Sequence, residues 1–162
     1  MAGAGTITLR AADEPDEPFL FELYVSTRAE EMAAWNWPPA QRDAFLRMQF
    51  TARRSSYRTQ HPGAEHSIVL ENGKPVGQLL VSFSDPEVCL VDVSVSAEAR
   101  GRGIGTKLIA DLMVRCAALR RTLKLSVATS NAAARRLYER MGFVRSGGDA
   151  MYDEMLWTPM LE

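Results

Sequence analysis

The residues whose types and spacing most clearly suggest a chemical function form the hexapeptide Arg100-Gly101-Arg102-Gly103-Ile104-Gly105. Because glycine has no side chain, three alternating glycines let the backbone approach a ligand closely. The apolar run before the hexapeptide is typical of a buried strand, and the three-to-four spacing of apolar residues after it predicts a helix. The free N–H groups and the positive dipole end of that helix would face the glycine turn. We therefore expect a site for phosphate oxygens here, with added positive charge from Arg100, Arg102 and Lys107.

The glycine spacing excludes two common phosphate-binding loops. The dinucleotide fingerprint requires Gly-x-Gly-x-x-Gly and an acidic residue about twenty positions later, whereas Arg121 stands at that distance from Gly101. The nucleoside triphosphate loop requires Gly-Lys-Ser/Thr, whereas Gly105 is followed by Thr106 and Lys107. A glycine turn that only packs tightly against its neighbours is the alternative to a ligand site.

A second segment adds an independent pattern. Leu123–Val127 alternates as a strand does, and Asn131 is placed to cap a helix that Gly142 ends. Together, Arg100-x-x-Gly103-x-Gly105 and Asn131-x-x-Ala134-x-x-Leu137-Tyr138-Glu139-x-x-Gly142-Phe143 resemble the two signatures of the GNAT superfamily of N-acetyltransferases, in the same order.

This resemblance implies that acetyl-CoA is the cosubstrate, and we expect no metal. In the family the glycine turn holds the pyrophosphate, which here implicates Arg100, Gly101, Arg102, Gly103, Ile104, Gly105 and Thr106. The pantetheine arm lies between two splayed strands and bonds to the first, here at Val93, Ser94 and Val95. The family's asparagine contacts this arm and its tyrosine lies near the thioester sulfur, positions matched by Asn131 and Tyr138.

The implied reaction is direct attack of a primary amine on the thioester. One group must remove a proton from the amine, and another must protonate the departing thiolate. The resemblance makes Tyr138 the candidate acid, although its place on an apolar helix face also fits an ordinary core tyrosine. A catalytically silent module that binds or senses acyl-CoA is the alternative function. The presence of Asn131 and Tyr138 favours activity, because a pure binder does not require the tyrosine.

Asp92 is the candidate base, because burial of a carboxylate within an apolar strand would raise its pKa. Strand alternation predicts that Asp92 lies on the face opposite Val91, Val93 and Val95. A structural role as a hydrogen-bond acceptor is one alternative for Asp92. Water, or another carboxylate, is the alternative base; the other candidates are Glu22, Glu30, Glu31 and Glu154.

We expect the first two helices and the last hairpin to form the acceptor site. Its candidate residues are Tyr24, Arg28, Trp35 and Trp37, which would hold an amine through aromatic faces beside neighbouring carboxylates. The same residues also fit ordinary helix packing. A small-molecule amine, an amino acid, an antibiotic and a peptide or protein amine are all compatible acceptors, and acyl groups other than acetyl stay open.

The rest of the chain supplies the elements that position these residues. We expect one α/β (α+β) domain over residues 1–162, with a flexible tail at 1–5 and the element order βααβββαβαββ. About seven strands would form a mixed, mostly antiparallel sheet, flanked by about four helices. The predicted strands cover residues 6–10, 67–70, 75–83, 90–95, 123–127, 144–146 and 151–157, and the helices 18–28, 39–60, 104–119 and 131–141. Phe45, Met48 and Phe50 should face the core, and Asn72-Gly73 predicts a hairpin.

Composition limits the remaining function classes. With a net charge of −1, no long-range field favours nucleic acid or an anionic membrane. Cys89 and Cys116 lack metal or disulfide spacing and fit small core residues in a reducing compartment. Neither a membrane-spanning run nor a signal-peptide pattern is present. We therefore expect a cytoplasmic monomer or homodimer.

Overall fold

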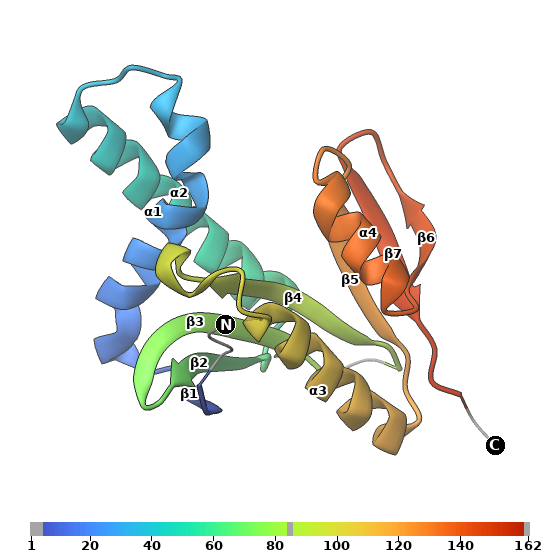
Figure 1. The fold of residues 1–162 in the computed structure, drawn as a ribbon. Helices are drawn as coiled ribbons and strands as arrows, with labels where there is room; N and C mark the ends of the chain where they lie inside the picture. Colours follow the sequence, from blue (N-terminus) through green and yellow to red (C-terminus); the bar gives the residue numbers. More distant parts are fainter. Residues whose placement is uncertain (1–4, 84–85, 161–162) are drawn as a thin grey trace.

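The computed structural model describes residues 5–83 and 86–160, which form strands and helices in the predicted order (Figure 1). The strands are β1 (Ile7–Ala11), β2 (Glu65–Glu71), β3 (Lys74–Ser82), β4 (Val88–Val95), β5 (Leu123–Ala128), β6 (Val144–Gly148) and β7 (Tyr152–Trp157). The helices are α1 (Glu17–Ala33), α2 (Pro39–Gln60), α3 (Ile104–Leu119) and α4 (Ala132–Arg140). Two short 3-10 helices, Glu14–Asp16 and Ala97–Ala99, were not predicted. All of the predicted tail except Gly5 lies outside the described residues.

One mixed sheet contains all the strands, in the order β1-β2-β3-β4-β5-β7-β6. Every neighbouring pair is antiparallel except β4 and β5. Asn72 and Gly73 form the predicted hairpin turn, with φ angles of 51° and 82°. These positive angles are what a two-residue hairpin loop requires of its central residues.

The sheet divides between β4 and β5. Only two residue pairs join these strands, Val88 with Leu123 and Cys89 with Lys124. Beyond them the strands diverge, so that β1–β4 and β5–β7 form two arms of a V (Figure 1). The edge of β4 that faces β5 is therefore left without a strand partner along most of its length.

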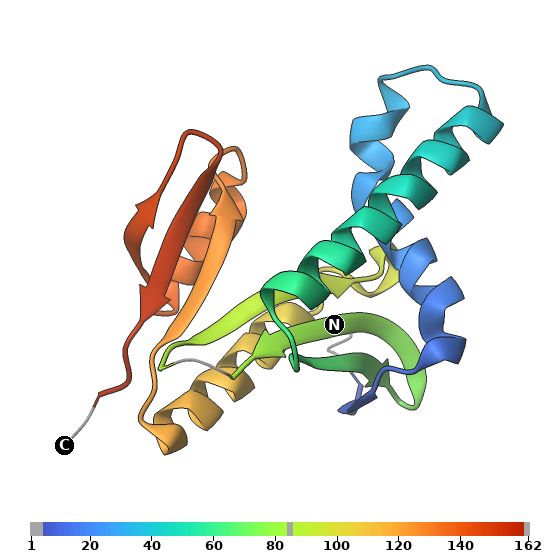
Figure 2. The same ribbon diagram turned by 180° about the vertical axis from the view of Figure 1, so that it is seen from behind.

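Helices cover both faces of the larger arm. The apolar face of α3 packs on one side, through Ile104, Leu108, Ile109, Leu112 and Cys116. On the other side, α1 and α2 form a second cluster that includes Phe21, Phe50 and Ile68 of β2. Figure 2 shows α2 crossing in front of β3 and β4 on this side. Among the helices of the described residues, there is no apolar stretch of a length that would cross a lipid bilayer.

The prediction of which α2 residues face the core is partly wrong. Phe50 is buried and Phe45 is half-buried, as expected, but the side chain of Met48 is 60% exposed. Leu46 is buried instead. Since helix positions two apart differ by about 200° around the axis, Leu46 and Met48 cannot both face the core.

Candidate active site

The glycine turn before α3 offers a row of free backbone donors. Gly101 and Gly103 have φ angles of 78° and 79°, which residues with a side chain rarely adopt. None of the backbone N–H groups of residues 101–106 has an acceptor among the described residues. The first helical bond after the turn runs from the Lys107 N–H to the Gly103 carbonyl. A Cβ atom added to Gly101, Gly103 or Gly105 would meet no protein atom within 4 Å. The turn is therefore open to an anionic ligand at the positive end of α3.

The basic residues around this turn are already bound to the protein. Arg102 forms a bidentate ion pair with Glu71, with Nη1–Oε2 and Nη2–Oε1 distances of 3.0 and 2.9 Å. Arg100 donates from Nε to the carbonyl oxygen of Val95 at 3.0 Å. Lys107 pairs with Asp111 one helical turn away. The hydrogen-bond donors of the turn that have no partner among the described residues are thus the backbone N–H groups of residues 101–106.

The peptide groups of β4 turn alternately toward β3 and toward the gap. The Ser96 N–H donates to the Val76 carbonyl on β3 at 2.7 Å, and Ser94 is directly opposite Gln78 in the same ladder. Because successive peptide groups of a strand point to opposite sides, those of Val93 and Val95 point away from β3. They face the side on which β5 has diverged.

A β-bulge in β4 decides the direction of Asp92. Leu80 pairs with Asp92 and Val81 with Leu90, so Val91 is the extra residue. Before the bulge, Val88 and Leu90 pack into the α3 core; after it, Val93 and Val95 do so. Without the extra residue, strict alternation would put Asp92 on the same face as Leu90. The prediction that Asp92 lies opposite Val93 and Val95 is thus confirmed, whereas Val91 belongs to the bulge.

Asp92 sits in a hydrogen-bonded network between β3, β4 and α2. Its Oδ2 accepts from Gln78 Nε2 at 3.0 Å and lies 3.5 Å from Arg53 Nη2, and its side chain is 14% exposed. Gln78 is fixed in turn by His66 at 2.7 Å, and Arg53 Nε donates to the Tyr57 hydroxyl at 2.6 Å. Burial raises the pKa of Asp92, although the nearby charge of Arg53 opposes the shift. A carboxylate of this kind holds a proton more readily than an exposed one.

Asp92 and Tyr138 line one cavity between the two arms of the sheet. Its volume is about 820 Å³, and Glu154 from β7 also lines it. The Tyr138 ring packs 5.9 Å from the Phe143 ring, and its hydroxyl makes no hydrogen bond with the described residues. Burial, and after it the charge of Asp92, raises the pKa of Tyr138. The phenol therefore stays protonated in a residue that lines the cavity.

The position of α4 follows from its cap and from an ion-pair cluster. Asn131 caps the helix as predicted, its Oδ1 accepting from the Ala134 N–H at 3.2 Å. Arg135 of α4 and Arg145 of β6 both bind the buried carboxylate of Asp153 on β7, at 3.0 and 2.8 Å. These contacts hold the helix that carries Tyr138 against its arm of the sheet.

The predicted acceptor residues separate into two groups. Tyr24 lines a second cavity of about 320 Å³ beside α2, and Arg28 donates to its hydroxyl at 2.8 Å. Trp35 and Trp37 instead pack against Phe45 where α1 meets α2, and they line none of the described cavities.

The alternative carboxylates are also spread over different places. Glu22 is exposed on α1 and lines none of the described cavities, whereas Glu154 faces the larger cavity together with Asp92. The side chains of Glu30 and Glu31 lie outside the described part of the structure.

Four residues around Asp92 were missed from the sequence: Arg53, Tyr57, His66 and Gln78. Arg53 and Tyr57 are four positions apart on α2, a spacing that puts them on one helix face. Gln78 is a polar residue within an apolar strand, which is also a readable signal. Asp92, which Gln78 and Arg53 contact, is distant from both in sequence, so only the fold brings these residues together.

Comparison with known proteins supports the relationship suggested by the two motifs. Among curated proteins, the 5-NmdU N-acetyltransferase of Pseudomonas phage PaMx11 is 40% identical over 62 residues, covering 38% of this chain and 43% of that protein. N-alpha-acetyltransferase 40 of Saccharomyces cerevisiae is 35% identical over 98 residues, covering 53% of this chain and 34% of that protein. The chain thus covers less than half the length of either relative.

The fold is that of solved acetyltransferases. The PaiA N-acetyltransferase from Thermoplasma acidophilum, solved in complex with coenzyme A, superposes with a TM-score of 0.72 at 13% identity, over 94% of this chain and 99% of that chain. Residues 20–143 match the family model described as the acetyltransferase (GNAT) family. Since this match covers most of the 162 residues, the chain belongs to the GNAT acetyltransferase family.

Proposed function

We propose that this chain transfers an acetyl group from acetyl-CoA to a primary amine by direct attack on the thioester. One observation carries the proposal: the unpartnered edge of β4 connects the free N–H groups before α3 with the cavity that Asp92 and Tyr138 line. The acceptor is an amine on a small molecule or on a peptide. The two curated relatives are both named for N-acetyl transfer, which supports an amine acceptor.

The residues of the glycine turn fit a pyrophosphate. The unengaged N–H groups of residues 101–106 would donate to its oxygens, and the missing side chains at Gly101, Gly103 and Gly105 leave room for it. The Val93 carbonyl and the Val95 N–H would bond to the amides of the pantetheine arm, as a neighbouring strand would, whereas the Val95 carbonyl already accepts from Arg100. Asn131 uses its oxygen to cap α4, which leaves its amide N–H group for the same arm.

Two side chains would handle the protons. Acetyl-CoA supplies the activated acyl group; the N–C bond forms as the C–S bond breaks. Asp92 accepts the proton that the amine loses, and its raised pKa suits this role near neutral pH. Tyr138, kept protonated by its raised pKa, donates a proton to the departing thiolate.

The proposal is tested by thiol release from acetyl-CoA with pooled amines, together with calorimetry of coenzyme A binding. Tyr138→Phe should lower turnover and leave coenzyme A binding intact; unchanged turnover would refute the acid role. Asp92→Asn should shift the pH–rate profile, whereas a loss of stability without such a shift would make Asp92 a scaffold residue. Binding without thiol release across a broad amine panel would indicate a silent acyl-CoA-binding module.

A further inference from the structure

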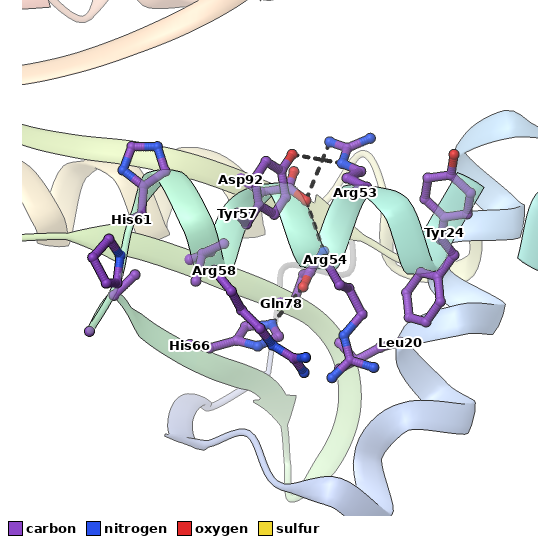
Figure 3. Close-up of a pocket in the computed structure, with 15 residues that line it drawn as sticks. Leu20, Tyr24, Arg53, Arg54, Tyr57, Arg58, His61, His66, Gln78 and Asp92 are labelled. Carbon is purple, nitrogen blue, oxygen red and sulfur yellow. Dashed lines mark hydrogen bonds and ion pairs between the residues drawn. The ribbon is translucent and has the colours of Figure 1, made fainter. Parts of the chain in front are cut away.

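The smaller cavity shares a wall with the candidate active site. It has a volume of about 320 Å³ and lies between α2 and the sheet (Figure 3). Asp92, Arg53, Tyr57 and His61 line both this cavity and the larger one. A molecule in the smaller cavity would therefore reach the same carboxylate that we propose as the base.

The two ends of the smaller cavity differ in charge. Arg53 turns toward Asp92, whereas Arg54 and Arg58 extend away from it, toward His66 and Leu20 (Figure 3). Three arginines line this cavity, against one carboxylate among its described lining residues. The end away from Asp92 therefore has an excess of positive charge, with Arg54 and Arg58 against the nearby carboxylate of Glu17.

These two distant arginines are weakly engaged by the protein. Arg54 lies 3.5 Å from Glu17, whose side chain is 55% exposed, so this pair is solvent-screened. Arg58 has no ion pair or hydrogen bond from its side chain among the described residues. Both guanidinium groups are therefore able to bind the anionic group of a ligand.

Part of the cavity lining is apolar. Leu20, Phe50 and Leu80 are buried side chains that line it, together with the ring of Tyr24. The volume is at the lower end of the range for small-molecule sites. Such a lining favours a short molecule with polar groups at its two ends.

We propose that the smaller cavity is the acceptor site, and that the acceptor is a small amine carrying a carboxylate or phosphate group. The amine lies at Asp92, and Arg54 and Arg58 bind the anionic group. This inference rests on the proposed acetyl transfer. A diamine would place its second ammonium group against two arginines, so the same arrangement discriminates against polyamines.

The test compares matched amines as acetyl acceptors. The probes are 5-aminopentanoate against n-pentylamine and 1,5-diaminopentane, and O-phosphoethanolamine against ethanolamine. The anionic amine should have a kcat/KM at least about tenfold higher than its partner, the scale of one charge-assisted hydrogen bond. The better of the two anionic probes distinguishes a carboxylate from a phosphate. Equal or better turnover of the neutral or dicationic amines would overturn the proposal.

Variants assign the preference to the arginines. Arg54→Gln and Arg58→Gln should each raise the KM of the anionic amine, and so reduce the ratio of its kcat/KM to that of its neutral partner about tenfold. Arg42→Gln is the matched control, because Arg42 is exposed on α2 and lines none of the described cavities. A preference that survives both substitutions would contradict the assignment.

Calorimetry separates this inference from the proposed function. Protein saturated with coenzyme A is titrated with 5-aminopentanoate and O-phosphoethanolamine. If an anionic probe binds, if Arg58→Gln weakens that binding, and if no acetyl transfer follows, the acceptor site is supported and the proposed reaction is contradicted. Acetyl transfer confined to neutral amines would support the proposed reaction and contradict the acceptor site. If neither anionic probe bound, the acceptor site would also be contradicted.

Discussion

Asp92 and Tyr138 face the same cavity from the two arms of the divided sheet, and they are coupled by charge. Burial is the larger cause of the raised pKa of Tyr138, and the negative charge of Asp92 raises it further. The ionised carboxylate of Asp92 thus makes it harder for Tyr138 to lose its proton. This coupling suits a pair in which one member accepts a proton and the other donates one.

Asp92→Asn should lower the pKa of Tyr138 toward its ordinary value. The neutral amide no longer opposes formation of the phenolate, while burial of the ring is unchanged. Titration of tyrosine absorbance in both proteins measures the shift, and Tyr138→Phe identifies the signal. An identical titration of Tyr138 in the two proteins would show that the groups are not coupled.

Gly105→Ala should separate ligand binding from stability. Gly105 lies in the first turn of α3, and an added Cβ would meet no protein atom within 4 Å. The free energy of unfolding should stay the same or rise by up to about 1 kcal/mol, because glycine is costly in a helix. Affinity for coenzyme A should fall at least about tenfold in calorimetry, since the methyl group occupies the space proposed for the pyrophosphate.

Gly147→Ala is the matched control for this substitution. Gly147 also has open space where a Cβ would stand and no positive φ, but it lies on β6. It should bind coenzyme A as the wild type does. Equal affinity in both variants would remove the glycine turn from the binding site.

The chain order of the elements and the location of the two motifs could be predicted from the sequence, because both depend on local patterns. The direction of Asp92 relative to Val93 and Val95 could also be predicted. The extra residue at Val91, which puts Leu90 and Val93 on the same face, could not, because the sequence of β4 contains no sign of a bulge. The pairing of Arg102 with Glu71 joins α3's turn to the end of β2, and no local pattern records it. The same reason hid the network of Arg53, Gln78 and Asp92, which three separate elements build.

Asp153→Asn should destabilise the smaller arm of the sheet. Asp153 is buried and binds arginines from two other elements, Arg135 and Arg145. Loss of its charge should lower the free energy of unfolding by about 2 kcal/mol, as measured by urea denaturation. Glu139→Gln removes only an exposed pair with Arg135 at 3.6 Å and should change stability by less than about 0.5 kcal/mol. Equal effects of the two substitutions would contradict a supporting role for the Asp153 cluster.

Asp16 should make the fold sensitive to acid. A bidentate bond from Arg10, with both distances 2.8 Å, lowers the pKa of Asp16 to about 2, compared with 3.8 ordinarily. The folded state thus binds this proton less tightly than the unfolded chain, so the stabilisation is present above the ordinary pKa and is lost as pH falls toward 2. Thermal unfolding of Asp16→Asn should show a deficit at pH 7 that shrinks across this interval.

A double-mutant cycle checks the assignment of that deficit to the ion pair. Arg10→Gln and Asp16→Asn remove the same interaction, so the double variant should lose less stability than the sum of the single ones. Strict additivity, or a deficit that persists unchanged at pH 2, would show that Asp16 stabilises the fold by other means.

The most direct test of the whole account follows the backbone amide resonances while coenzyme A is added to the protein. The largest chemical-shift changes should fall on residues 101–106, which we propose bind the pyrophosphate, and on Val93 and Val95, which we propose bind the pantetheine arm. Smaller changes should reach Tyr138 across the cavity. Saturable binding with those amides unmoved, or no binding at millimolar coenzyme A, would contradict a cosubstrate seated between the two arms of the sheet.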